Sequence, residues 1–244
     1  MNFPTHLSQL KTACSSCSLQ ELCLPFGLSD SELNQLDQLV QRAQPKHRGG
    51  YLYRADAPFQ SLYAIRTGFF KTQVLHEDGR EQITGFYMMG EIIGMDAIST
   101  ERHTCDAIAL EDSEVCEIPF GRLEQLSRDI PALQRHLYKI MSREIVRDHG
   151  IMLLLGSMNA EERLAAFLLN LSQRYASRGY SANNFHLRMT REEIGSYLGL
   201  KLETVSRTLS KFQKDGLINV QNKAIELRDI PALKLAMRQQ ECRT

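Results

Sequence analysis

Three cysteines lie close together near the start of the chain, where Cys14, Cys17 and Cys23 have the spacing C-x2-C-x5-C. Cysteine thiolates bind both zinc and iron–sulfur clusters, and both usually take four protein ligands. A flexible turn with this spacing can bring three thiolates to one site, so a fourth must come from elsewhere. Cys105, Cys116 and Cys242 remain, and spacing alone does not choose among them.

Three kinds of site are open to this cysteine triplet: an iron–sulfur cluster, a zinc ion, or a redox-active disulfide between Cys14 and Cys17. Residues 1–11 lack the apolar core of a signal peptide, and no segment approaches the roughly 18 apolar residues of a membrane span. We therefore expect a cytoplasmic protein. In a reducing compartment, clustered cysteines more often bind metal or do redox chemistry than form structural disulfides.

The segment Thr190–Lys214 has the pattern of two short helices joined by a tight turn. Thr190 and Glu193 form a capping box for the first helix, and Gly199 permits the turn. The second helix is expected from about Lys201 to about Lys214. Five apolar side chains should pack between the two helices: Ile194, Leu198, Val205, Leu209 and Phe212.

The polar face of that second helix has side chains suited to reading DNA. Arg207 can donate two hydrogen bonds to guanine, Glu203 can accept one from cytosine, and Ser206 can contact a base edge. The segments 217–220 and 224–227 read as two strands of a wing. A plain helical hairpin with solvated charges is the alternative, but the caps, turn glycine and wing together favour a DNA-binding winged helix-turn-helix.

The charge of the C-terminal segment, but not that of the whole chain, supports a DNA-binding domain. The whole chain carries 29 basic and 29 acidic residues, so its formal charge is zero. Between Leu187 and Lys223, seven basic residues face four acidic ones. A positive C-terminal part is typical of a separate nucleic-acid-binding domain.

Short strands are expected between about Pro45 and Phe120, where glycines are frequent. Strand-like runs cover 51–53, 61–66, 69–75 and 81–87, and Asp78-Gly79 reads as a hairpin turn. This pattern predicts an antiparallel barrel or jelly roll. A short helix, Ser29–Arg42, precedes it, with Ser29 and Glu32 as its capping box.

A long helix is expected from Pro131 to Leu155, with one stripe of residues spaced three and four apart. Such a stripe needs a partner, and a second copy of the chain is the simplest one. Asn159 and Glu162 cap the next helix, expected to stop at Gly179. The stripe consists of Leu137, Met141, Ile145, Asp148, Met152 and Leu155.

Five stretches together carry a resemblance to a known family: SLYAIRTG (61–68), EQITGF (81–86), CEIPF (116–120), NAEERLAAFLLNLS (159–172) and ETVSRTL (203–209). The chain resembles the CRP/FNR superfamily, and within it the FNR-type oxygen-sensing transcriptional regulators. The resemblance covers nearly the whole chain. It implies an α+β fold with a β-roll sensor domain, a dimerisation helix and a C-terminal winged helix-turn-helix.

The resemblance also implies a domain plan. Residues 1–27 would be a cysteine-rich cluster-binding segment and residues 28–128 the β-roll. Residues 129–157 would form the dimerisation helix and residues 158–244 the DNA-binding domain. No phosphate-binding glycine loop, G-x-S-x-G or H-E-x-x-H motif is present, so we expect no enzyme activity.

FNR-type regulators bind an oxygen-labile [4Fe-4S] cluster through three N-terminal cysteines and one from the β-roll. CEIPF matches the stretch that carries the fourth ligand, which implies Cys116; Cys105 and Cys242 are then ordinary thiols. The loaded homodimer would bind palindromic TTGAT-type sites through the E-x-x-S-R residues Glu203, Ser206 and Arg207.

The resemblance extends to regulation. It implies that the cluster-loaded protein activates or represses genes of anaerobic metabolism, and that oxygen destroys the cluster. Asp148 would lie beside its own copy in the dimer and, with Ile145 in the same stripe, would set a monomer–dimer balance, with a plain solvated charge at the edge of the stripe as the alternative. The hairpin His76–Gly79 is a candidate contact for RNA polymerase, with a plain solvated turn as the alternative.

One departure separates the chain from the cyclic-nucleotide-binding branch. Gly90–Gly94 matches the family's G-E-x-x-G turn, but the residues that follow, RHTCDAIA at 102–109, lack the phosphate clamp. The second hypothesis is a CRP-type regulator gated by a small molecule, with the cysteines holding a structural zinc.

Overall fold

The computed structural model describes residues 14–75 and 79–237. Helices and antiparallel sheets are both present, so the α+β class is confirmed. Contacts divide the chain into two compact units. The first comprises the chain up to Thr72 together with Phe86–Ser142, and the second comprises Gln73–Gly85 together with the chain from Arg143 onward.

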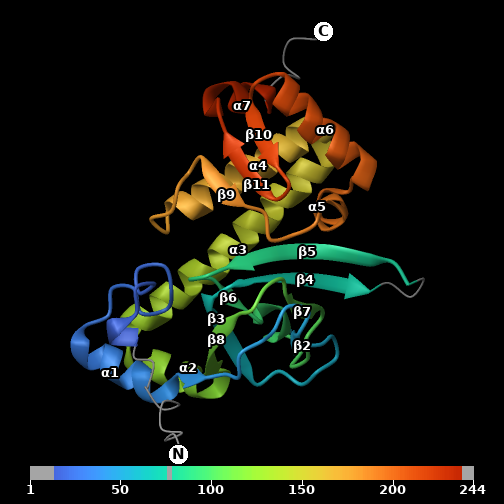
Figure 1. Ribbon diagram of the computed structural model, residues 1–244. Helices are drawn as coiled ribbons and strands as arrows, with labels where there is room; N and C mark the ends of the chain where they lie inside the picture. The colour runs from blue at the N-terminus through green and yellow to red at the C-terminus, as the bar shows by residue number, and fades with distance from the viewer. Residues whose placement is uncertain (1–13, 76–78, 238–244) are drawn as a thin grey trace, which may run out of the picture. The chain divides into compact units, whose positions relative to one another are not determined.

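Eight strands of the described chain form the β-roll, in two four-stranded sheets of order β1–β8–β3–β6 and β2–β7–β4–β5 (Figure 1). Neighbours in each sheet are mostly distant in sequence, as a jelly roll requires. The four predicted strands are present to within one residue. The strands are β1 (Gln41–Arg42), β2 (Tyr51–Tyr53), β3 (Ser61–Thr67), β4 (Phe69–Leu75), β5 (Glu81–Met88), β6 (Ile92–Ile93), β7 (Asp106–Ala109) and β8 (Glu114–Pro119).

The predicted hairpin turn at Asp78-Gly79 is described only in part. Residues 76–78 lie outside the described residues, so the proposed polymerase contact at His76–Gly79 has no structural account here. Gly79 has φ +82°, the backbone conformation for which glycine was expected.

Two helices precede the strands of the β-roll in the sequence, one lies between two of its strands, and one follows the last strand. The capping box of α1 is confirmed, since the Ser29 amide donates to Glu32 over 2.8 Å. The predicted helix end at Arg42 is wrong, because Gln41 and Arg42 pair with β8 instead. Sequence patterns did not reveal α2, whose Leu123 is fully buried. These helices are η1 (Cys14–Ser16), α1 (Asp30–Leu39), η2 (Met95–Ala97) and α2 (Phe120–Asp129).

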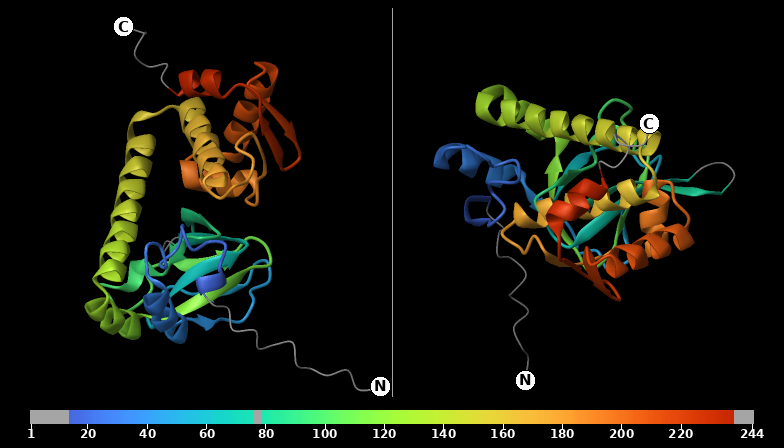
Figure 2. Two further views of the ribbon diagram at one scale, coloured as in Figure 1. Left: turned by 90° about the vertical axis from the view of Figure 1, so that its left-hand side faces the viewer. Right: turned by 90° about the horizontal axis from the view of Figure 1, so that it is seen from above.

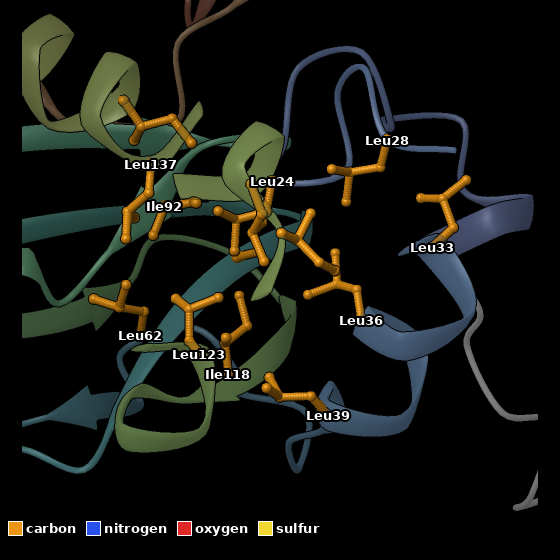
Figure 3. Close-up of a cluster of buried hydrophobic side chains, with 14 residues drawn as sticks. Leu24, Leu28, Leu33, Leu36, Leu39, Leu62, Ile92, Ile118, Leu123 and Leu137 are labelled. Atoms are coloured by element: carbon orange, nitrogen blue, oxygen red, sulfur yellow. The ribbon is translucent and has the colours of Figure 1, made fainter. Parts of the chain in front are cut away.

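A single hydrophobic cluster attaches the N-terminal part of the chain to the β-roll (Figure 3). Leu24 follows the cysteine triplet and is 1% exposed. In Figure 3, Leu36 and Leu39 lie on the side of α1 that faces Ile118 and Leu123. Each fully buried leucine contributes about 1.5–3 kcal/mol, so this cluster holds the cysteine segment firmly in place.

Helix α3 (Pro131–Ser157) runs without interruption through 27 residues (Figure 2). The predicted stripe is divided along it. Leu137 is buried in the hydrophobic cluster and Met141 packs against that cluster, so both side chains already have contacts within one chain. Farther along, Ile145 is 55% and Met152 63% exposed. Tyr138, two turns before Ile145, is 59% exposed, so the exposed side of α3 also extends along its first part.

The C-terminal winged helix has the predicted order of elements. Asn159 and Thr190 both cap their helices, and their capping boxes are confirmed. The predicted C-terminal cap of α4 at Gly179 is two residues too late, because Ser177 is the C-cap. Strand β9 and helix α7 were not predicted. The elements are α4 (Ala160–Ala176), β9 (Asn184–His186), α5 (Arg191–Leu198), α6 (Leu202–Lys214), β10 (Ile218–Gln221), β11 (Ala224–Leu227) and α7 (Ile230–Ala236).

Two glycines permit the tight turn between α5 and α6. Gly199 has φ +63°, as expected of the turn residue. Gly195 was not singled out from the sequence, yet a Cβ there would lie 2.5 Å from the carbonyl oxygen of Leu200. The turn thus depends on close backbone approach as well as on a left-handed residue.

No helix among residues 14–75 and 79–237 is long and apolar enough to cross a bilayer.

Candidate functional site

The structure brings the three N-terminal cysteines and Cys116 together at one small pocket of the first unit. A compact turn holds the triplet, in which the Cys17 amide donates to the Cys14 carbonyl over 3.1 Å. The Cys23 amide donates to the carbonyl of Leu19 over the same distance. The three cysteines of the C-x2-C-x5-C spacing therefore line the same pocket.

Cys116 reaches this pocket from the middle of a sheet. Strand β8 lies between β1 and β3, and Cys116 is paired with Arg42 on one side and Ala64 on the other. A central strand has hydrogen-bonded neighbours on both sides, so its side chains have little positional freedom. Cys116 therefore lies on a strand in the interior of a sheet, whereas the other three cysteines lie on a turn that packs against the β-roll.

Two contacts fasten the turn to its surroundings. The Asp37 carboxylate of α1 accepts hydrogen bonds from the Cys14 amide and from the Ser15 hydroxyl, the latter over 3.2 Å. Leu22 packs so closely on Gly90 that a Cβ at Gly90 would lie 3.0 Å from the Leu22 Cβ. The first glycine of the G-E-x-x-G turn therefore makes room for the cysteine segment.

Burial favours the neutral form of three of the pocket thiols, which are Cys14, Cys23 and Cys116. Desolvation raises the pKa of Cys23 to about 12. It also raises the pKa of Cys116, and that of Cys14, where the Asp37 carboxylate adds to the effect. A metal that bound here would displace these protons, because thiolates, not thiols, are metal ligands.

The donor set fits an iron–sulfur cluster. All five described cysteines are free thiols. No three Cys, His, Asp or Glu side chains of residues 14–75 and 79–237 converge closely enough for a single ion. A four-iron cluster has a different requirement, because each iron takes its own thiolate. Four free thiols around an apolar pocket match that requirement.

Cys105 lies in a different part of the β-roll. Its thiol donates to Asp96 over 3.6 Å, and the Tyr53 hydroxyl donates to the same carboxyl group over 3.3 Å. The His103 ring stacks on Tyr53 with 3.6 Å between centroids. Burial raises the pKa of Cys105 to about 12. Sequence reasoning missed this network, and Cys242 lies outside the described residues.

The second predicted site is the outer face of α6. All five residues expected between α5 and α6 are buried, at 0–2% exposure. Glu203, Arg207 and Ser210 are exposed. Ser206 is half-buried, and its hydroxyl accepts a hydrogen bond from Arg191 Nη1 over 3.3 Å. The geometry is that of a recognition helix, whose early turns present their polar side chains outward.

Two family models match the chain, one over the C-terminal winged helix and one over the β-roll. Residues 162–236 match the Crp-like helix-turn-helix domain. Residues 44–129 match the cyclic nucleotide-binding domain, which is the fold of the β-roll. The second match concerns the fold, since the chain departs from the phosphate clamp after Gly94.

Relatives match over nearly the full length. The transcriptional regulatory protein btr of Bordetella pertussis is 48% identical, over 94% of this chain and 95% of its own. The fumarate and nitrate reduction regulatory protein of Escherichia coli is 48% identical over 90% of this chain and 88% of its own. An anaerobic regulatory protein of Pasteurella multocida is 50% identical over 90% of this chain and 81% of its own.

A solved structure supports the same assignment. The structure of FixK2 from Bradyrhizobium japonicum aligns with a TM-score of 0.74 and 31% identity, covering 81% of this chain and 96% of that one. Fold, helix-turn-helix and full-length similarity thus converge, and the chain belongs to the CRP/FNR family of DNA-binding transcriptional regulators, which are not enzymes.

Proposed function

We propose that the protein is a cytoplasmic, oxygen-responsive regulator of anaerobic metabolism genes that carries a [4Fe-4S] cluster on Cys14, Cys17, Cys23 and Cys116. The observation that carries this proposal is the meeting of four free thiols at one apolar pocket. Relatives named as anaerobic regulators, at 48–50% identity, support the physiological part.

Through a bound cluster, the cysteines would link the Cys14–Cys23 turn to strand β8. A bound cluster supplies iron centres that take one thiolate each and react with oxygen. Four such bonds would fix the Cys14–Cys23 turn to β8. Without them, the turn is held by the hydrogen bonds to Asp37 and by leucine packing, so oxygen would weaken the attachment of this segment.

Dimerisation would use the exposed part of α3. Ile145 and Met152 offer an apolar face, and Asp148 is an exposed charge in the same stripe. In a two-fold parallel pairing each Asp148 lies near its copy, and the two carboxylates repel. That repulsion would keep the dimer weak in the cluster-free protein. Cluster binding, which would attach the cysteine segment to β8, would then shift the monomer–dimer equilibrium toward the dimer.

DNA reading would belong to α6 of each protomer. Arg207 would contact guanine, Glu203 cytosine, and Ser206 a base edge, within a palindromic TTGAT-type site. Two-fold symmetry in the dimer would match the two-fold symmetry of the site. RNA polymerase is the further partner we propose, since the protein regulates transcription.

The test is anaerobic purification followed by iron and acid-labile sulfide analysis, a visible spectrum, and DNA binding before and after air. We expect a brown protein with about four irons per chain that binds DNA and loses both properties in air. Cys116→Ser should abolish loading, whereas the control Cys105→Ser should load normally.

A zinc-loaded, colourless and air-stable protein would instead support the small-molecule-gated alternative. The inward packing of His103, with a side chain 2% exposed, disfavours a nucleotide phosphate in the stretch that follows Gly94.

A further inference from the structure

An arginine lies at the edge of the cysteine pocket. Of the described residues that line it, Arg66 alone carries a permanent charge. It stands where the pairing of β3 with β8 changes register, because Ile65 pairs with Val115 but Thr67 pairs with Glu114. A bulge leaves one residue unpaired and re-aims its side chain, and here that residue is Arg66.

Arg66 belongs to a group of three charged residues, which we call the arginine triad: Arg42, Glu114 and Arg66. Glu114 Oε2 lies 3.5 Å from Arg66 Nη1, and Glu114 Oε1 accepts from Arg42 Nη2 over 2.7 Å. One carboxylate thus contacts two guanidinium groups.

The triad shares a sheet face with the fourth thiol. Arg42 is directly opposite Cys116 in the β1–β8 pair, and Glu114 lies two residues before it in β8. Residues opposite each other, and residues two apart, project from the same face. The strand pairing itself therefore places two guanidinium groups, and the carboxylate that they share, beside Cys116.

We propose that the arginine triad is the counter-charge of the cysteine site, with Arg66 as a positioning residue that stabilises the bound cluster. This rests on the function proposed above. Four thiolates bring more negative charge than an iron–sulfide core offsets, and an uncompensated charge beside apolar side chains is costly. Arg66 and Arg42 are 37% and 44% exposed, so their effect is moderate and depends on salt.

Two substitutions separate a charge effect from simple bracing, because they change the charge in opposite directions while both break the same ion pair. Arg66→Met keeps an aliphatic stem and removes the positive charge. Glu114→Gln keeps the shape and removes the negative charge. If the ion pair acts only by holding the two strands together, both substitutions should weaken cluster retention. If the positive charge itself stabilises the cluster, only Arg66→Met should weaken cluster retention.

The experiment measures iron release from the full-length, anaerobically loaded protein to a ferrous chelator, without oxygen, at about 0.05 M and 1 M salt. At low salt we expect release about fivefold faster for Arg66→Met and slower than wild type for Glu114→Gln. The differences should shrink at high salt, where the Debye length is about 3 Å. Arg66→Lys should behave like wild type.

The matched control is Arg48→Met, which removes an exposed arginine of the same chain segment and should leave the rate unchanged. Thermal unfolding of each apo variant checks that it folds. Faster release from both Arg66→Met and Glu114→Gln, or equal rates in all variants, overturns the counter-charge assignment alone. A wild-type protein that takes up no iron and sulfide overturns the proposed function and this inference together.

Discussion

Two cysteines of the β-roll show how surroundings decide the role of a residue. Cys116 projects into the pocket that holds the N-terminal thiols. Cys105, eleven positions earlier, donates to Asp96 beside the stacked rings of Tyr53 and His103. Cys105 is buried and Cys116 is half-buried, so the cysteine that is more shielded from water is not the one at the pocket. Neighbouring thiols distinguish the two, and only Cys116 has them.

Cys105 should be nearly inert toward alkylation in the folded apo protein. Burial raises its pKa from 9.0 to about 12, which lowers the thiolate fraction at pH 8 by roughly a thousandfold. We expect iodoacetamide to modify Cys105 at least about a hundredfold more slowly than glutathione, as measured by site-resolved mass spectrometry. Denaturation in urea is the control and should restore the ordinary rate. A folded-state rate close to that of glutathione would contradict this picture.

Arg207 should carry base discrimination. It is exposed on α6, where a guanidinium can donate two hydrogen bonds to one guanine. Arg207→Ala should cost about 1–3 kcal/mol of binding free energy at the specific site and relax the preference at one base pair. Binding titrations on the specific site, single-base variants of it and random DNA measure this. Equal losses on all of these sequences would show that Arg207 contacts only the phosphate backbone.

At the scale of elements, one side chain joins three helix ends in the second unit. The Arg163 guanidinium of α4 donates to the carbonyls of Leu155 and Met158, near the end of α3, over 2.8 Å each. It also donates to the carbonyl of Leu198, the last residue of α5, over 3.0 Å. Helix C-termini leave carbonyls without intrahelical partners, and a cation satisfies them well.

Arg163→Met should therefore destabilise the winged helix. Hydrogen bonds from a charged donor contribute about 1.5–3 kcal/mol each, and exposure at one of the three reduces the total. We expect a loss of roughly 2 kcal/mol in the free energy of unfolding in urea, with the iron content of the loaded protein unchanged. Lys214→Met removes an exposed charge from the last turn of α6 and should change stability by less than about 0.5 kcal/mol. Similar losses in the two variants would argue against the Arg163 contacts.

At the scale of the whole molecule, α3 has two different tasks along its length. Its first part is a core helix, because Leu137 is 6% exposed and Met141 packs on the same hydrophobic cluster. Its second part exposes Ile145, Val146 and Met152. Exposed apolar side chains on one helix are typical of an interaction site, and we propose a second copy of α3 as the partner.

Asp148→Ala should shift the monomer–dimer balance of the cluster-free protein. Removing two like charges that approach each other in the dimer lowers its electrostatic cost. We expect the apo dimer dissociation constant to fall by about tenfold or more in sedimentation equilibrium, with DNA binding retained in air. Ile145→Asp is the opposing variant and should weaken the dimer. An Asp148→Ala protein that stays monomeric without its cluster would remove Asp148 from the switch.

Sequence by itself determined the local features. The capping boxes at Ser29, Asn159 and Thr190 depend on contacts three residues apart, and the turn at Gly199 depends on one backbone angle. Such features are legible because their causes lie within one helical turn. Elements stabilised by distant partners were missed, among them α2, β9 and α7.

Only the tertiary structure decided where distant residues meet. Spacing could not select a fourth thiol, and the family resemblance supplied Cys116 without a physical cause. The cause is the place of β8 between β1 and β3, which directs Cys116 into the pocket of the triplet. Because β1 pairs with β8, Gln41 and Arg42 lie in a strand and not in the predicted helix. The same pairing places the arginine triad beside Cys116. Strand pairing joins residues more than fifty positions apart, and no local pattern encodes it.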